Sequence, residues 1–204
     1  MALRIQYVRR NGMIVCADDK VAWLAARYDG VTATDCSRIV CKNGRISKQR
    51  AGLLWKKLGR ESDGWFGPFA HGVEREPVIA EWVLAEFGIP PNRGLCRGEN
   101  PRHLATPDAL SSEAVAEFKT SVRPLKAIMT RYSDQLQWQM HVTGADCLLF
   151  VVENRDSLQR EWEWVPRDDQ RLRVLVAHAD AFLERLDAAR ERFGDGWRQG
   201  TPIP

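Results

Sequence analysis

Apolar residues recur along the chain with two periods, about 3.6 residues in some segments and two in others. The helical period predicts helices at about 20–28, 35–42, 47–58, 70–88, 124–143 and 168–193. Strand-like patterns cover 1–18, 92–120, 146–153 and 160–165. This alternation of helices and strands predicts an α/β fold with a central mixed β-sheet flanked by helices.

Residues that form turns or end helices, together with the strand patterns, refine this prediction. Asn11-Gly12 predicts a hairpin turn, residues 59–68 form a loop rich in glycine, and Gly88 ends the fourth helix. The segment 146–153 is continuously apolar, which is typical of a central strand, whereas 160–165 alternates and favours an edge position.

The composition is that of a globular chain of 204 residues with a net charge of +3, so we expect one domain over 1–204. No apolar run approaches a membrane span, and the start lacks an apolar signal core, which predicts a cytoplasmic protein. The five cysteines show no C-x-x-C spacing and are interpreted as buried or idle thiols. Residues 1–50 carry ten basic and four acidic side chains, which fits either a locally bound anionic partner or a solvated surface.

Glu76 stands near the centre of an apolar helical stripe, opposite Glu74 and Glu81. A carboxylate on a buried face is costly unless a cation or metal meets it, so Glu76 is a candidate site residue. This interpretation places Pro77 in the first helical turn. The alternative is a helix that begins at Pro77, with Glu76 merely preceding it.

Asp108, Glu117 and Lys119 form the second candidate group. Asp108 follows a proline at the end of a strand-like run, and the period of a strand puts Glu117 and Lys119 on one face with Phe118 on the other. Hard oxygen ligands of this kind suit Mg²⁺, and a nearby lysine can orient water or offset phosphate charge.

The order of these motifs resembles the PD-(D/E)xK nuclease core. Within that superfamily, the run YSDQLQWQMHVTGADCLLFVV and the stretch ARYDGVTATD are similar to the phage lambda exonuclease and YqaJ-type viral recombinase family. The resemblance covers about 22–153, with the predicted helix 168–193 as its continuation. One departure is T-P-D-A where the family has S-P-D-G: Ala109 requires a turn without positive φ or one that tolerates strain.

The resemblance implies roles for individual residues. Asp108 and Glu117 would be metal ligands with the Phe118 carbonyl, Glu76 would help to hold the metal or its water, and Lys119 would be the catalytic lysine. Gln137 would lie beside the site as the second glutamine of a Q-x-Q pair. The implied cofactor is Mg²⁺, with Mn²⁺ able to substitute.

The resemblance also implies a pocket for a DNA 5′-phosphate. Its members would be Arg27, Thr34 and Thr106, completed by Arg123 or by its rival Lys126. Trp65 is a candidate for stacking on an unpaired base.

The function implied is a Mg²⁺-dependent 5′→3′ double-strand DNA exonuclease of phage recombination, which leaves 3′ overhangs for a single-strand annealing partner. The family forms ring-shaped trimers, and such proteins are encoded by phages or prophages in bacterial hosts. The alternatives are a structure-specific or restriction-type endonuclease and a non-catalytic module that binds DNA ends.

Overall fold

A computed structural model describes residues 13–16, 20–59 and 70–194. The helices are α1 (Lys20–Asp29), α2 (Cys36–Ile39), α3 (Arg50–Lys57), α4 (Ala70–Phe87), α5 (Leu125–Thr143) and α6 (Asp169–Phe193). The strands are β1 (Met13–Cys16), β2 (Val31–Thr32), β3 (Gly94–Arg97), β4 (His103–Ala105), β5 (Ala109–Leu110), β6 (Val115–Ser121), β7 (Cys147–Asn154) and β8 (Arg160–Pro166). The turn predicted at Asn11-Gly12 and the side chain of Trp65 lie outside the described residues.

Within the described residues, the strands form two mixed four-stranded sheets, in the orders β1-β3-β4-β2 and β5-β6-β7-β8. In the second sheet β6 and β7 are parallel, whereas β5 and β8 are antiparallel to their neighbours. The α/β class is therefore confirmed, with two mixed sheets in place of the single central sheet predicted. The expected central position of 146–153 and edge position of 160–165 are also confirmed, since β7 is internal and β8 is an edge strand.

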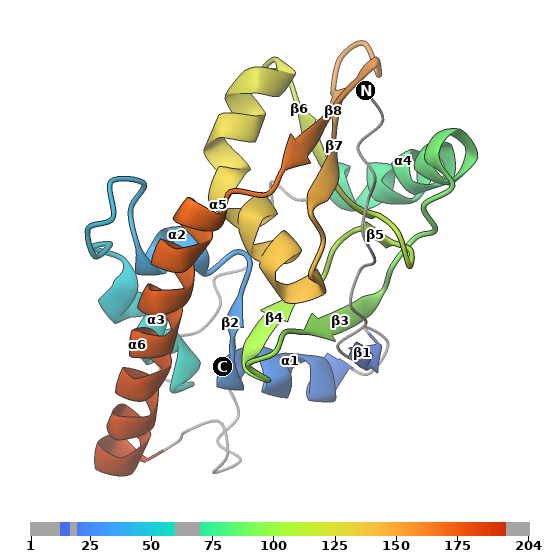
Figure 1. Ribbon diagram of the computed structural model, residues 1–204. Coiled ribbons are helices and arrows are strands. Elements are labelled where there is room, and N and C mark those ends of the chain that lie inside the picture. Colours follow the sequence, from blue (N-terminus) through green and yellow to red (C-terminus); the bar gives the residue numbers. More distant parts are fainter. Residues whose placement is uncertain (1–12, 17–19, 60–69, 195–204) are drawn as a thin grey trace.

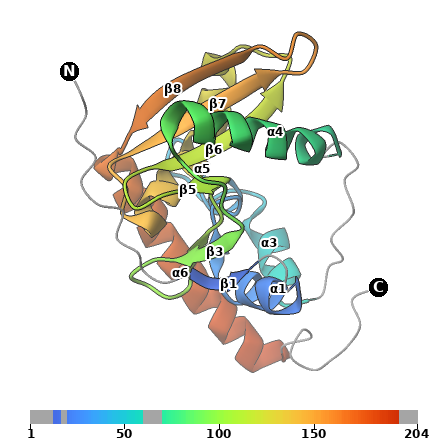
Figure 2. The same ribbon diagram turned by 90° about the vertical axis from the view of Figure 1, so that its right-hand side faces the viewer.

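The second sheet is covered on both faces, by α4 on one side and α5 on the other (Figure 2). Alternate residues of β7 divide between the two layers: Phe150 packs toward α5, and Val151 packs toward α4. This explains the continuous apolar run of the strand, because both of its faces are buried.

Helix α5 is the central helix of the molecule (Figure 1). It contacts the second sheet, and its Trp138 Nε1 donates a hydrogen bond to the Leu104 carbonyl of the first sheet. It also packs against α6 and ends at Gly144, whose φ of 74° is left-handed. Because α5 touches both sheets, it fixes side chains of one sheet relative to those of the other.

The long helix predicted at 70–88 is confirmed as α4. Pro77 lies inside this helix, seven residues after its first residue Ala70, and not in the first turn as predicted. The alternative, a helix that begins at Pro77, is also wrong. In the part of the chain that the structure describes, no helix has the length and hydrophobicity needed to cross a membrane.

Candidate active site

Asp108, Glu117 and Lys119 come together around strand β6. The Asp108 Oδ2 atom accepts a hydrogen bond of 2.6 Å from the backbone N–H of Phe118. The ammonium of Lys119 forms an ion pair with Glu117 Oε1. Phe118 packs on the opposite face, in the cluster under α4, so the predicted alternation is confirmed. A strand therefore presents the acid and the lysine side by side, and the preceding turn brings Asp108 to them.

The turn that carries Asp108 is held from outside. The side-chain amide of Asn92 donates to the Pro107 carbonyl at 2.8 Å, and the Asn92 backbone N–H donates to the Asp108 carbonyl at 2.9 Å. Ala109 continues directly into β5, and among described non-glycine residues only Leu158 has a positive φ. The replacement of the family's glycine by Ala109 therefore causes no backbone strain.

Two amides from α5 fix the carboxylate of Glu117. Gln135 Nε2 donates to Oε1, and Gln139 Nε2 donates to Oε2 at 2.6 Å. The two glutamines are four residues apart, so they lie one helical turn apart on the same face of α5. Glu117 is only 2% exposed, and with Lys119 it has three donors on two oxygens. Its position is therefore set by the helix as well as by its own strand.

The structure does not place Gln137 beside this cluster. Its Nε2 donates to the Pro166 carbonyl at 2.9 Å, and its Oε1 accepts from the Asp168 N–H at 2.8 Å. Gln137 thus ties α5 to the start of α6. The placement predicted for Gln137 is taken by Gln135 and Gln139, which sequence reasoning passed over although their spacing of four residues puts them on one face.

Negative charge exceeds positive charge in the cluster. Burial and the nearby Glu117 raise the pKa of Asp108 well above its usual range. Burial lowers the pKa of Lys119, but Glu117 and Asp108 raise it by more, so the lysine is held as a cation. Two carboxylates and one ammonium in a low-dielectric environment favour an additional cation.

Glu76 lies on α4 within electrostatic reach of the cluster but is not part of its hydrogen-bond network. Partial desolvation and the charge of Glu117 raise the pKa of Glu76, and Lys119 opposes the rise. Its side chain is exposed, whereas Ile79 and Val83 are buried. The predicted buried position of Glu76 is therefore wrong: its spacing puts it on the same face of α4 as Ile79 and Val83, but among the described side chains of this helix burial begins only at Ile79.

The motif at residues 27–34 is stabilised by a buried lysine that the sequence analysis did not identify. Lys57 Nζ donates to the carbonyls of Arg27 and Gly30 and to Asp35 Oδ2, at 2.6, 2.7 and 2.7 Å. Asp35 also accepts from the backbone N–H and the hydroxyl of Thr32. Lys57 is 4% exposed, so this network is a buried clamp on the motif.

The close approach of strands in this motif explains its glycine. A Cβ atom on Gly30 would lie 2.5 Å from the Arg102 carbonyl oxygen, closer than real contacts allow. A larger residue there would displace β2 from β4.

The residues predicted to bind a 5′-phosphate fall into two groups. Strands β2 and β4 are parallel, and Thr34 and Thr106 follow their carboxyl ends, so both leave the sheet at the same edge. The Thr106 hydroxyl oxygen is buried and has no hydrogen-bond partner. Arg27 is on α1, where its guanidinium lies 4.2 Å from the centre of the Trp23 ring.

Arg123 does not join this first group. It follows β6 and lines a pocket with Lys119 that includes neither Arg27 nor the two threonines. The β6–α5 connection and α1 lie at opposite ends of the molecule (Figure 1). Lys126, in the first turn of α5, is exposed and forms an ion pair with Glu163 at 2.9 Å. A single pocket completed by either residue is therefore not what the structure shows.

The donor set fits a divalent cation. Asp108 and Glu117 supply hard carboxylate oxygens, and the Phe118 carbonyl belongs to β6, directly after Glu117. No group of three or more histidine, cysteine, aspartate or glutamate side chains has the geometry of a metal site in the described residues. A cation held here would thus rely on two carboxylates and retain water ligands, as Mg²⁺ commonly does.

Comparison with known proteins decides the family. The sequence matches the YqaJ-like viral recombinase domain over residues 22–146. The chain belongs to this family. No curated protein sequence matches it significantly.

Solved structures agree with the YqaJ-like assignment at the level of the fold. An alkaline exonuclease from Laribacter hongkongensis superposes with a TM-score of 0.69 at 23% identity, covering 88% of this chain and 99% of that one. The same exonuclease in complex with dAMP gives a TM-score of 0.68 at 24% identity, with the same coverage. A phage-related exonuclease from Haemophilus somnus 129PT gives 0.65 at 11% identity, covering 80% and 96%. The predicted nuclease fold of the YqaJ type is therefore confirmed.

Proposed function

We propose that this protein is a Mg²⁺-dependent 5′→3′ exonuclease that degrades one strand of duplex DNA from its end. The observation that carries the proposal is the buried cluster of Asp108, Glu117 and Lys119, with its excess of negative charge. The similarity in fold to alkaline and phage-related exonucleases supports the reaction class.

Asp108, Glu117 and the Phe118 carbonyl would hold the divalent cation, and exposed Glu76 would act from a greater distance. When bound, such a cation supplies Lewis-acid activation of water and of the phosphodiester. Mn²⁺ is the expected substitute. Gln135 and Gln139 keep the Glu117 oxygens in place, which limits reorganisation during the reaction.

Lys119 would act as a fixed positive charge beside the reacting phosphate. Its raised pKa favours the ammonium form, which donates hydrogen bonds and stabilises charge rather than accepting a proton. Hydrolysis breaks the bond between phosphorus and the 3′ oxygen. The proton balance is completed when water supplies hydroxide to phosphorus and a proton to the leaving oxygen.

Each round of this reaction produces a new 5′-phosphate, the group that the protein is proposed to recognise. The released nucleotide ends in a 3′-hydroxyl, and the shortened strand carries a new 5′-phosphate. Arg27, Thr34 and Thr106 are proposed to bind that phosphate, with the unpartnered hydroxyl of Thr106 as a ready donor. Repeated digestion would leave the 3′ overhang used by a single-strand annealing partner in phage-type recombination.

We further propose that the protein acts in the cytoplasm of a bacterial host on phage or prophage DNA, as a homo-oligomer such as a ring trimer. Light scattering at several concentrations measures the oligomer, and co-purification with a co-expressed annealing protein tests the partner.

The decisive assay uses a linear duplex labelled on each strand in turn, with a 5′-phosphate or a 5′-hydroxyl, with and without Mg²⁺. We expect Mg²⁺-dependent shortening from the 5′-phosphorylated end and an intact closed circular plasmid. Cutting of the circle would favour the endonuclease. Binding of ends without nucleotide release in any divalent metal would favour the non-catalytic module.

A further inference from the structure

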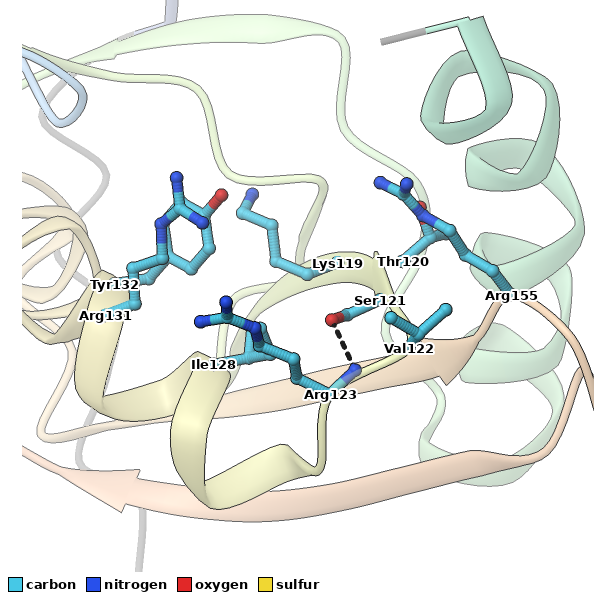
Figure 3. A pocket seen from close by; sticks show the side chains of 9 residues that line it. All are labelled: Lys119, Thr120, Ser121, Val122, Arg123, Ile128, Arg131, Tyr132 and Arg155. Atoms are coloured by element: carbon cyan, nitrogen blue, oxygen red, sulfur yellow. Dashed lines mark hydrogen bonds between the residues drawn. The ribbon is translucent and has the colours of Figure 1, made fainter. Parts of the chain in front are cut away.

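A basic pocket of about 220 Å³ opens beside Lys119 at the end of β6. Four cationic side chains line it: Lys119, Arg123, Arg131 and Arg155. They come from three separate places, namely β6 with the loop after it, the first half of α5, and the turn after β7. Figure 3 shows these side chains around a common opening, with the Tyr132 ring next to Arg131. The lining contains no carboxylate.

The three guanidiniums form no ion pair or hydrogen bond with any described residue. Elsewhere in the described chain, arginines such as Arg160, Arg171 and Arg190 meet carboxylates at 2.8 Å. Within the pocket, Arg123 and Arg155 are held through their backbone, by N–H groups that donate to the Ser121 hydroxyl and carbonyl. The backbone is thus fixed while the charged ends stay available to an anion.

The pocket is continuous with the proposed active site through Lys119. That lysine contacts Glu117 on one side and lines the pocket on the other, with its Nζ 5.1 Å from the centre of the Tyr132 ring. Neither Thr34 nor Thr106 lines the pocket, and Thr106 precedes Asp108 by two residues. The threonines follow β2 and β4, which lie in the part of the molecule away from the β6–α5 connection, with β5 between (Figure 1).

The geometry points to a second phosphate subsite: the pocket binds a backbone phosphate of the strand being cut, on the side of the scissile bond away from the terminal phosphate. This placement rests on the proposed function. Each strand of a duplex presents a phosphate about every 3.4 Å of axis, so a strand that passes Lys119 brings its next phosphates to the arginines. Guanidinium groups bind phosphate oxygens in pairs and read no sequence.

The first test needs no catalysis. Binding of a 5′-phosphorylated duplex in EDTA is measured over a series of salt concentrations for the wild type, for Arg131→Ala/Arg155→Ala, and for Arg173→Ala, an exposed arginine on α6. We expect the double variant to bind roughly tenfold or more weakly, with a salt slope smaller by about 2, because two phosphate contacts are lost. Arg173→Ala should match the wild type. Thermal unfolding should show all three folded, since the side chains are exposed.

The second test locates the phosphate. Duplexes with one methylphosphonate, which removes a single backbone charge, are compared position by position. The wild type should lose affinity when the neutral group lies one or two nucleotides beyond the scissile bond, and the double variant should not respond there. An unchanged salt slope would overturn the proposal, as would equal sensitivity of both proteins. Binding of free dAMP is titrated in parallel for both proteins. If the double variant loses dAMP binding but binds the duplex as the wild type does, the proposal is overturned and the pocket is assigned to a free nucleotide.

These outcomes are separable from the failure of the proposed function. If the wild type does not cleave DNA but the salt slope falls in the double variant, the pocket stands as a site for a DNA backbone phosphate and the nuclease proposal fails. If the wild type cleaves DNA and the slope is unchanged, the reverse holds.

Discussion

Glu117 and Glu153 are both buried and lie on the neighbouring strands β6 and β7, yet their surroundings differ. Glu153 is fully buried on the face toward α4 and accepts hydrogen bonds from Arg75 and Arg160 at 2.7–3.0 Å. Burial raises its pKa, but the two guanidiniums lower it by more. Glu117, on the opposite face, has one lysine and two neutral amides, and a second carboxylate beside it.

The difference separates a structural charge from a functional one. Around Glu153 the cations outnumber the acid, so the charge is compensated within the fold. Around Glu117 and Asp108 the acids outnumber the cation, which raises the pKa of Asp108 and leaves a demand for positive charge. Such a site is stabilised further by a bound cation, because its own protein partners do not balance its charge.

Substitution of the two glutamates should produce opposite phenotypes, and the largest effect falls on activity. Glu117→Ala or Asp108→Ala should lower Mg²⁺-dependent cleavage about 1,000-fold or more, since several kcal/mol of transition-state stabilisation depend on the cation. DNA binding in EDTA should change little. Single-turnover cleavage and binding titrations measure the two quantities, and substantial activity in both variants would remove this cluster from the mechanism.

Glu153→Gln should leave cleavage of folded protein nearly intact but lower the free energy of unfolding by about 3 kcal/mol, because two partly buried arginines lose their carboxylate. Urea unfolding measures this loss, and Glu117→Gln serves as the matched control. A control variant destabilised as much as Glu153→Gln would contradict the distinction between the two sites.

The buried ion pair of Lys57 and Asp35, near the first sheet, extends the comparison. Lys57→Met keeps the apolar stem but leaves Asp35 and two carbonyls without their donor, which should cost about 2–3 kcal/mol of stability. Because the clamp holds Arg27 and Gly30, the variant should also lose most of the preference for 5′-phosphorylated over 5′-hydroxyl ends. Lys48→Met, at an exposed position shortly before α3, is the control and should change neither quantity.

Arg27→Ala tests recognition of the 5′-phosphate of the DNA directly. A charge-assisted arginine–phosphate contact contributes about 1.5–3 kcal/mol, or roughly ten- to hundredfold in binding. The loss should fall on the phosphorylated substrate and spare the hydroxyl one. Competition between the two substrates measures it, and an unchanged preference would exclude Arg27 from the pocket.

These contrasts also show what sequence can reveal. Asp108, Glu117 and Lys119 were predicted because a strand's period of two fixes which side chains share a face, and because the motif order is specific. Gln135 and Gln139 were missed because a rotation of the helix by a fraction of a turn exchanges them with Gln137. Lys57 could not be told from Lys56, and the Arg75–Glu153 pair joins positions 78 residues apart. Contacts of this kind depend on packing between elements, which local periodicity does not encode.

The smallest expected effect comes from a third buried group, which carries no net charge. His103 Nδ1 lies 3.0 Å from His141 Nε2, where β4 meets α5. Burial and then the proximity of His103 lower the pKa of His141 to about 4, with Arg167 adding to the shift. Burial also lowers the pKa of His103, although Asp180 at 3.1 Å opposes the change.

The sign of the pH effect follows from these shifts. Below the ordinary histidine pKa of 6.5, His141 binds a proton in the unfolded chain but stays neutral in the folded protein. The free energy of unfolding therefore falls as the pH decreases from 6.5 toward 4. At pH 5.5 the loss from His141 should be about 1 kcal/mol. His141→Gln keeps a polar partner for His103 and should flatten the stability curve between pH 7.5 and 5.5 by that amount, whereas replacement of exposed Arg173 by alanine should not. A curve of unchanged slope in His141→Gln would contradict the lowered pKa of His141, because it would mean that this histidine binds its proton equally well in the folded and the unfolded protein.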